Sequence, residues 1–210
     1  MTPQQIEALF TRPDGSYLCA RWERPVAPVV FGVDDATLSL LKGACEAVIA
    51  LAGHRMAATD AETGANLMVF FLRDWAELLD VPDLGRLVPG LAALVARLRA
   101  ADANQYRAFR FEKSGAIRAA MVFLRMDEAL SAMPADNLSL DQMIRIILLW
   151  SETAFRDRSP LALSRDGATV LRPEIAGIVR AAYDPAMPPA ATDPSHALRL
   201  AARIAAAGRA

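Results

Sequence analysis

The chain contains 210 residues, of which 54% are hydrophobic and 22% charged, and its 23 basic and 24 acidic residues leave a formal net charge of −1. Such a composition is typical of a folded globular domain and excludes a largely disordered chain. Because a near-neutral balance creates no extended cationic field, we expect neither nucleic acid nor a membrane surface as a partner.

The N-terminal segment Met1–Phe10 lacks the cationic and apolar regions of a secretory signal, and the apolar runs are too short to span a bilayer. We therefore expect a cytoplasmic protein. The two cysteines, Cys19 and Cys45, are expected to be small buried side chains, since a reducing compartment disfavours disulfides. No linker divides the chain, which predicts a single domain over 1–210, with 186–210 as a helical tail joined through prolines.

The first half of the chain predicts mixed helices and strands. Asp34 and Asp35 offer an N-cap to a long amphipathic helix that stops at Gly53. The segment Asn66–Leu72 is apolar on both faces, as expected for a strand covered on both sides. In chain order the predicted elements are a helix over 2–10, strands over 16–22 and 28–33, a helix over 34–53, a strand over 66–72 and a short helix over 75–79.

The second half predicts a helix over 89–101 and then the clearest hairpin of the chain, in which strands 106–112 and 117–126 flank the turn Lys113-Ser114-Gly115. Ser139 and Gln142 form a capping box for the strongest predicted helix, which runs to about Arg156. Two further helices are expected over 173–183 and 193–208. The predicted fold class is α+β: a small mixed sheet with an antiparallel hairpin, packed against helices, with a helical C-terminal part.

The motifs of several common enzyme classes are missing from the sequence. It contains no G-x-G-x-x-G, no P-loop and no G-x-S-x-G, which removes the usual signs of dinucleotide, nucleotide and α/β-hydrolase chemistry. The two histidines, His54 and His196, lie far apart and outside any H-E-x-x-H motif, and we expect them to cap helices or contact solvent. The sequence therefore predicts no metal and no cofactor.

One stripe of the predicted helix combines ionisable and apolar side chains. A rotation of about 100° per residue brings together Asp141, Arg145, Leu148, Leu149, Glu152 and Arg156. The acidic residues precede the basic ones by four positions, which favours ion pairs on a solvated face. The two leucines do not suit such a face, and we expect the terminal helices to cover them.

Several segments, in this order, resemble a bacterial family of unknown function related to zincin metallopeptidases: Arg21-Trp22 with Pro25, residues 64–70 (GANLMVF), 152–159 (ETAFRDRS) and 180–188 (RAAYDPAMP). The resemblance extends from about Arg21 to Pro188. It implies a zincin-like fold, in which a ligand-bearing helix lies beneath a mixed sheet whose edge strand borders the substrate cleft. The helix from Asp141 to Arg156 and the strand 117–126 correspond to these two parts.

The resemblance also implies a degenerate metal site. If Glu152 takes the place of the second metal ligand, the first ligand and the general base correspond to Leu148 and Leu149. A zinc hydrolase needs three protein ligands and a base that activates the bound water, and leucine supplies neither. The implied protein keeps the fold without a catalytic metal, and no catalytic residue is expected.

The preferred functional hypothesis is a non-catalytic zincin-like domain that binds a small ligand or a protein partner in the former cleft. The expected contacts combine an aromatic side chain with a cluster of charges, which suits specific recognition: Trp150, Glu152, Arg156, Asp157 and Arg158.

Two other functions remain open. The first is a metal-independent hydrolase that uses Asp141, Glu152 or Asp157 as general acid and base, although nearby arginines are expected to keep these carboxylates ionised. The second is a structural subunit whose exposed apolar surface is buried in an oligomer.

Overall fold

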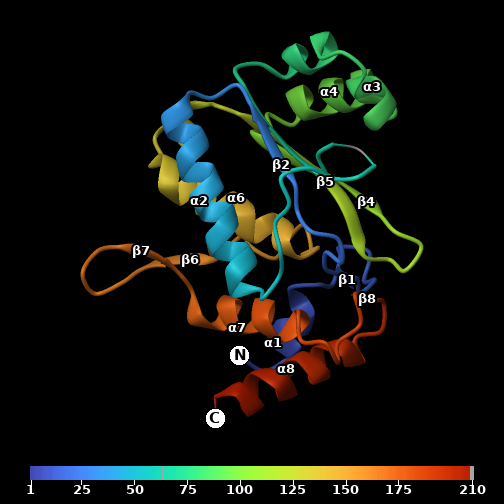
Figure 1. The fold of residues 1–210 in the computed structure, drawn as a ribbon, viewed down its shortest axis with the longest axis vertical. Helices are drawn as coiled ribbons and strands as arrows, with labels where there is room; N and C mark the ends of the chain where they lie inside the picture. Colours follow the sequence, from blue (N-terminus) through green and yellow to red (C-terminus); the bar gives the residue numbers. More distant parts are fainter. Residues whose placement is uncertain (63, 209–210) are drawn as a thin grey trace.

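A computed structural model of the chain describes residues 1–62 and 64–208 and places a mixed four-stranded sheet at its centre (Figure 1). Strands β2 (Pro28–Phe31), β3 (Leu67–Leu72) and β5 (Ile117–Arg125) are parallel, and β4 (Gln105–Phe111) pairs antiparallel with β5. The strand order is β2-β3-β5-β4, so β2 and β4 are the edges of this sheet. The protein is therefore a mixed α/β structure that contains the predicted hairpin.

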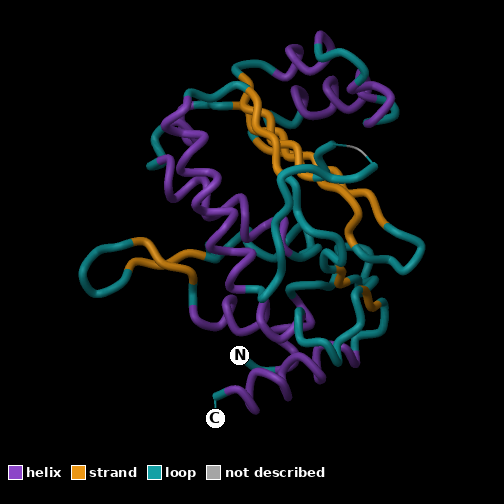
Figure 2. Tube along the Cα trace, in the orientation of Figure 1, coloured by secondary structure: helices purple, strands orange, loops and turns teal. Residues whose placement is uncertain are grey.

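Helices cover both faces of the sheet (Figure 2). One face packs against α2 (Asp35–Leu51) and α6 (Ala135–Ile147), and the other against the 3-10 helix η1 (Trp75–Asp80), α3 (Leu84–Leu87) and α4 (Leu91–Ala100). Successive side chains of a strand point to opposite faces. Accordingly Leu67 and Val69 of β3 belong to one apolar core, whereas Phe70 and Leu72 belong to the other. This confirms the prediction of a strand buried on both sides.

The remaining elements lie mostly beyond the end of α2, where α1 (Pro3–Ala8) and α8 (Ser195–Ala207) pack side by side (Figure 1). Within residues 186–208, strand β8 (Ala190–Ala191) pairs with β1 (Cys19–Ala20), and α8 packs on α1 and α7 (Pro173–Ala182). The other short elements are α5 (Glu128–Ser131), β6 (Leu161–Leu163) and β7 (Thr169–Leu171). Among the described residues, no helix combines the length and apolar character needed to cross a membrane.

Local signals in the sequence identified several elements correctly. The Asp34 side chain caps α2 by accepting from the Thr37 amide at 2.8 Å, as predicted. Cys19 and Cys45 are buried free thiols, also as predicted. The short elements α3, α5, β6, β7 and β8 were missed, because segments of two to four residues are too short for a hydrophobic period to emerge.

The predicted helix over 139–156 is wrong at both ends. Helix α6 begins at Ala135, and Ser139 lies inside it, where its hydroxyl donates to the Ala135 carbonyl at 2.6 Å instead of capping the helix. The helix ends at Ile147, and Leu148 already has extended backbone angles, φ −131° and ψ 156°. The predicted stripe is therefore split between a helix and the irregular segment that follows it.

Two further expectations also need correction. Strand 117–126 was expected at the edge of the sheet, but β5 lies between β3 and β4, and β4 takes the edge position. His196 was expected to cap a helix or contact solvent, but it is 4% exposed and its Nδ1 is hydrogen-bonded to the Tyr17 hydroxyl at 2.8 Å. The Tyr17 ring also meets the His196 ring edge-on with centroids 6.0 Å apart, and because Tyr17 is distant in the sequence, no local pattern could indicate this contact.

The buried His196 predicts acid sensitivity. Burial, together with nearby Arg199, lowers the pKa of His196 from 6.5 to about 4. Because the unfolded chain binds this proton more readily, the histidine's contribution to stability is complete above pH 6.5 and is lost as the pH falls towards 4. We expect the loss to be about 2 kcal/mol.

Urea denaturation at pH 7 and pH 4.5 of the wild type and His196→Gln measures this effect. Glutamine does not titrate, so the variant should lose less stability on acidification. His54→Gln is measured in parallel, because burial also lowers the pKa of the half-buried His54 and its share of the acid sensitivity has to be separated from that of His196. Equal acid sensitivity of the wild type and His196→Gln would contradict the assignment.

Candidate functional site

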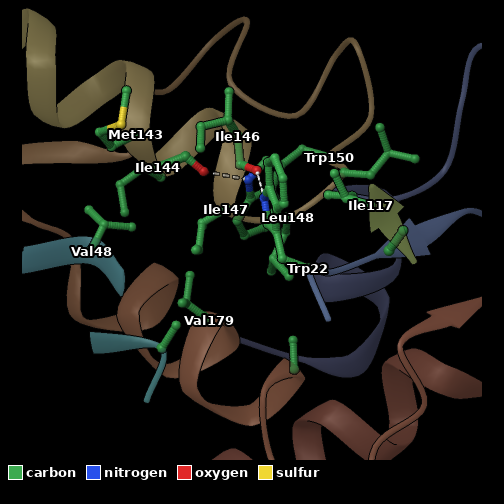
Figure 3. Close-up of a cluster of buried hydrophobic side chains, with 14 of the residues drawn as sticks. Trp22, Val48, Ile117, Met143, Ile144, Ile146, Ile147, Leu148, Trp150 and Val179 are labelled. Carbon is green, nitrogen blue, oxygen red and sulfur yellow. Dashed lines mark hydrogen bonds between the residues drawn. The ribbon is translucent and has the colours of Figure 1, made fainter. Parts of the chain in front are cut away.

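Three side chains from outside the helix cap the C-terminal end of α6, and Figure 3 shows two of them, Trp22 and Trp150. A helix leaves its last carbonyls without intrahelical donors. Here the Ile144 carbonyl accepts from Trp150 Nε1 and the Ile146 carbonyl from Trp22 Nε1, both at 2.8 Å. The Tyr183 hydroxyl donates to the Ile147 carbonyl at 3.0 Å. Burial raises the pKa of Tyr183, so its hydroxyl keeps the proton that it donates.

After α6 the chain runs alongside the N-terminal segment. Leu148 and Arg21 form an antiparallel bridge, and the Leu149 amide donates to the Ala20 carbonyl at 2.8 Å. The Ser151 amide donates to the Leu9 carbonyl at 2.8 Å. These bonds explain why the chain leaves the helix after Ile147. They also bury Leu148 and Leu149, which are 0% and 7% exposed.

A cavity of about 710 Å³ lies between the edge strand β4 and the segment after α6, and we call it the β4 pocket. Pockets for small ligands commonly enclose about 300–1,000 Å³. Its lining combines arginines, aromatic rings and one carboxylate: Arg12, Gln105, Tyr106, Arg107, Ala108, Phe109, Phe111, Arg145, Leu149, Trp150, Ser151, Glu152, Phe155 and Arg156. The pocket is thus charged on one part of its surface and apolar on another.

Three of the five expected contact residues, Trp150, Glu152 and Arg156, line the β4 pocket. Asp157 and Arg158 are exposed and do not line it, and Arg158 forms an ion pair with Glu174 of α7 at 2.9 Å. The expected cluster is thus divided, because residues 150–156 do not continue the helix on which the prediction placed them.

Trp150 shapes the pocket through its ring. It is 9% exposed, and its indole N–H is already bound to the Ile144 carbonyl. Its ring stacks on Phe10 with centroids 5.0 Å apart and meets Phe155 edge-on at 5.1 Å. Trp150 therefore offers a ligand apolar surface but no hydrogen bond.

The contribution of β4 to the pocket was not predicted from the sequence. Its alternate residues Gln105, Arg107 and Phe109 face α6, where the guanidinium of Arg107 contacts Gln142. A signal was present, because the period of two that predicts the strand places Arg107 on the same face as Phe109 and Phe111. A charged residue within an apolar strand face indicates a buried charge, which is a mark of functional sites.

The three carboxylates considered for hydrolysis lie in different surroundings. The Asp141 carboxylate of α6 accepts from Arg145 Nε at 2.7 Å and from Gln142 Nε2 at 3.1 Å. Glu152 lines the pocket, whereas Asp157 lies outside it. In the described part of the chain, no hydrogen bond joins two of these carboxylates, and no group of three or more His, Cys, Asp or Glu residues could hold a metal ion.

A second, smaller cavity of about 240 Å³ lies between α2, α6 and the other edge strand, β2. Its lining is apolar apart from Lys42, and it includes the Cys45 thiol. Burial raises the pKa of this thiol to about 12, which keeps it protonated and unreactive at neutral pH. This cavity therefore offers fewer polar contacts for recognition than the β4 pocket.

Comparisons with models of protein families, with curated proteins and with solved structures found no match to this chain. The relation to zincin metallopeptidases therefore stays a prediction from the sequence.

Proposed function

We propose that this protein is a non-catalytic binding module whose ligand occupies the β4 pocket. The observation that carries this proposal is the pocket itself, which encloses about 710 Å³ and brings Trp150, Glu152 and Arg156 next to the aromatic residues of β4. Recognition sites commonly combine an apolar surface with a few polar groups that fix orientation. Glu152 and Arg156 lack an ion-pair partner among the described residues, so both are free to meet a ligand.

We also propose that the frame around this pocket is zincin-like. In support, α6 packs on one face of the mixed sheet and an edge strand, β4, borders the pocket. Leu148 and Leu149 correspond by the resemblance to the first metal ligand and the general base; both are buried, although they follow the end of α6 and do not lie on the helix as the resemblance implies. Without those groups a zinc-bound water cannot be held or activated, which favours binding over cleavage.

Fragment screening by ¹H–¹⁵N NMR tests this function. We expect hits from a chemically diverse library to shift the amide resonances of residues 105–111 and 149–156. Residues elsewhere on the surface should be shifted less often. Phe111→Ser should reduce these shifts, because Phe111 lines the pocket and is 42% exposed. Phe31→Ser is the matched control, since Phe31 ends the opposite edge strand and is 45% exposed.

Two results would contradict the proposal. Hits that gather mainly at the cavity beneath β2, or spread evenly over the surface, would remove the β4 pocket as the binding site. Cleavage of bound fragments, detected by mass spectrometry and lost in Glu152→Gln, would favour the hydrolase that uses carboxylates. Added zinc is expected to leave the melting temperature unchanged, and a shift of several degrees would count against a degenerate metal site.

A further inference from the structure

The β4 pocket carries more positive than negative charge. Four arginines line it, Arg12, Arg107, Arg145 and Arg156, whereas Glu152 is the one carboxylate in its lining. Asp141 offsets part of this excess, because its Oδ2 lies 2.7 Å from Arg145 Nε. Asp141 also interacts electrostatically with Arg107 without forming an ion pair with it, so the positive charge of Arg107 is offset only in part.

Within the described part of the chain, no carboxylate lies within ion-pair distance of Arg107. Its Nη2 donates to the side-chain oxygens of Gln105 and Gln142, each at 2.6 Å, and both acceptors are neutral amides. Its Nε is buried and has no hydrogen-bond partner. The two glutamines thus hold the guanidinium in place without balancing its charge.

A partly buried cation without an ion-pair partner is costly. Burial and the neighbouring Arg145 lower the pKa of Arg107 to about 10, although Asp141 acts in the opposite direction, and the guanidinium is still protonated at neutral pH. A charge removed from water is tolerated when an opposite charge lies beside it. A bound anion would supply that charge to Arg107.

Aromatic rings lie beside the arginines. The Arg145 guanidinium sits over the Phe155 ring, with its Cζ 5.1 Å from the ring centroid. Phe109 and Phe111 stack with centroids 6.4 Å apart, and both line the pocket. These rings offer a flat apolar surface next to the positive charges, which suits a ligand that carries an aromatic group.

We infer that the β4 pocket binds a small molecule in which an oxyanion, a carboxylate or a phosphate, adjoins an aromatic ring. The oxyanion lies between Arg107 and Arg145, and the ring packs against Phe155 and Phe109. This inference rests on the proposed binding function and adds the chemical class of the ligand. Guanidinium groups match the planar oxygens of such anions, which is why arginine is common at carboxylate and phosphate sites.

Four matched probes test the ligand class by NMR titration and calorimetry: 3-phenylpropionate, 3-phenylpropanamide, 3-phenylpropylamine and phenyl phosphate. The first two differ in charge and hardly in shape. We expect 3-phenylpropionate or phenyl phosphate to shift the resonances of residues 105–111 and 149–156, and the better of these anions to bind at least about tenfold more tightly than the amide. The ratio of the affinities of these two anions distinguishes a carboxylate ligand from a phosphate ligand.

Variants of two arginines on the same strand identify the charge that is used. Arg107→Gln should weaken binding of the anion about tenfold or more, and should bring its affinity close to that of the amide. Arg110→Gln is the matched control, because Arg110 is exposed, does not line the pocket and donates instead to the Leu87 carbonyl. The comparison of acid with amide uses the wild type, so it does not depend on how well the Arg107 variant folds.

The outcomes separate this inference from the proposed function. If the amide or the amine binds the pocket as tightly as the anions, the ligand class is wrong, whereas the binding function stands. If the anions bind but Arg107→Gln and Arg110→Gln weaken them equally, general electrostatic attraction is responsible and the inference is overturned. If no probe shifts pocket resonances while the fragment library does, the ligand class is again wrong and the pocket is retained.

Discussion

Replacing Trp22 with alanine is expected to lower the free energy of unfolding by about 3–5 kcal/mol. The side chain is 0% exposed, so its removal leaves a large cavity in the core. The change also deprives the Ile146 carbonyl of its donor at the end of α6. Urea denaturation followed by circular dichroism measures the loss.

Trp22→Phe separates the two contributions. Phenylalanine keeps most of the apolar volume but cannot donate to Ile146, and an unsatisfied buried carbonyl costs about 1–3 kcal/mol. We therefore expect a smaller loss than for alanine, together with shifted resonances at residues 148–151. If Trp22→Ala lowers the free energy of unfolding by less than about 1 kcal/mol, the Trp22 side chain neither fills the core nor caps the helix in the way described.

Replacing Asp141 with alanine is expected to cost about 2–4 kcal/mol, because it removes the carboxylate that balances Arg145 and lies near Arg107. The side chains of Asp141 and Arg145 are 10% and 21% exposed, so water screens the remaining charges poorly. Urea denaturation at neutral pH measures the change.

Two controls accompany this measurement. Asp83→Ala breaks the ion pair with Arg86 at the surface, where the side chains are 75% and 85% exposed, and should cost less than about 1 kcal/mol. The double variant Asp141→Ala with Arg145→Met removes both charges and should recover part of the loss. If Asp141→Ala and Asp83→Ala destabilise the protein equally, Asp141 does not balance a buried charge.

The prediction that failed most clearly concerns the helix after Ser139. The i,i+4 pattern of charges from Asp141 to Arg156 is compatible with a helix throughout, and nothing local marks a stop at Ile147. The stop depends on Trp22, Tyr183 and residues 9–21, which are distant in the sequence. Tertiary contacts of this kind override helix propensity, because each propensity difference amounts to only a few tenths of a kcal/mol.

The candidate site was recovered in part for a related reason. Trp150, Glu152 and Arg156 drew attention as a cluster of charges beside an aromatic residue, and all three line the pocket. The opposite side of the pocket belongs to β4, which was predicted as a strand but not as an edge strand. Strand order depends on which strands pair across the sheet, and a local period of two carries no information about that pairing.

The sequence by itself determined the elements whose signals are local. The period of two indicates the hairpin, the run of apolar residues indicates the strand covered on both sides, and Asp34 with Gly53 marks the ends of a long helix. Only the tertiary structure decided where α6 ends, which strand lies at the edge and that Arg107 is held between two amides without a carboxylate. Those features require contacts between residues far apart in the chain, and such contacts form only once both cores are packed.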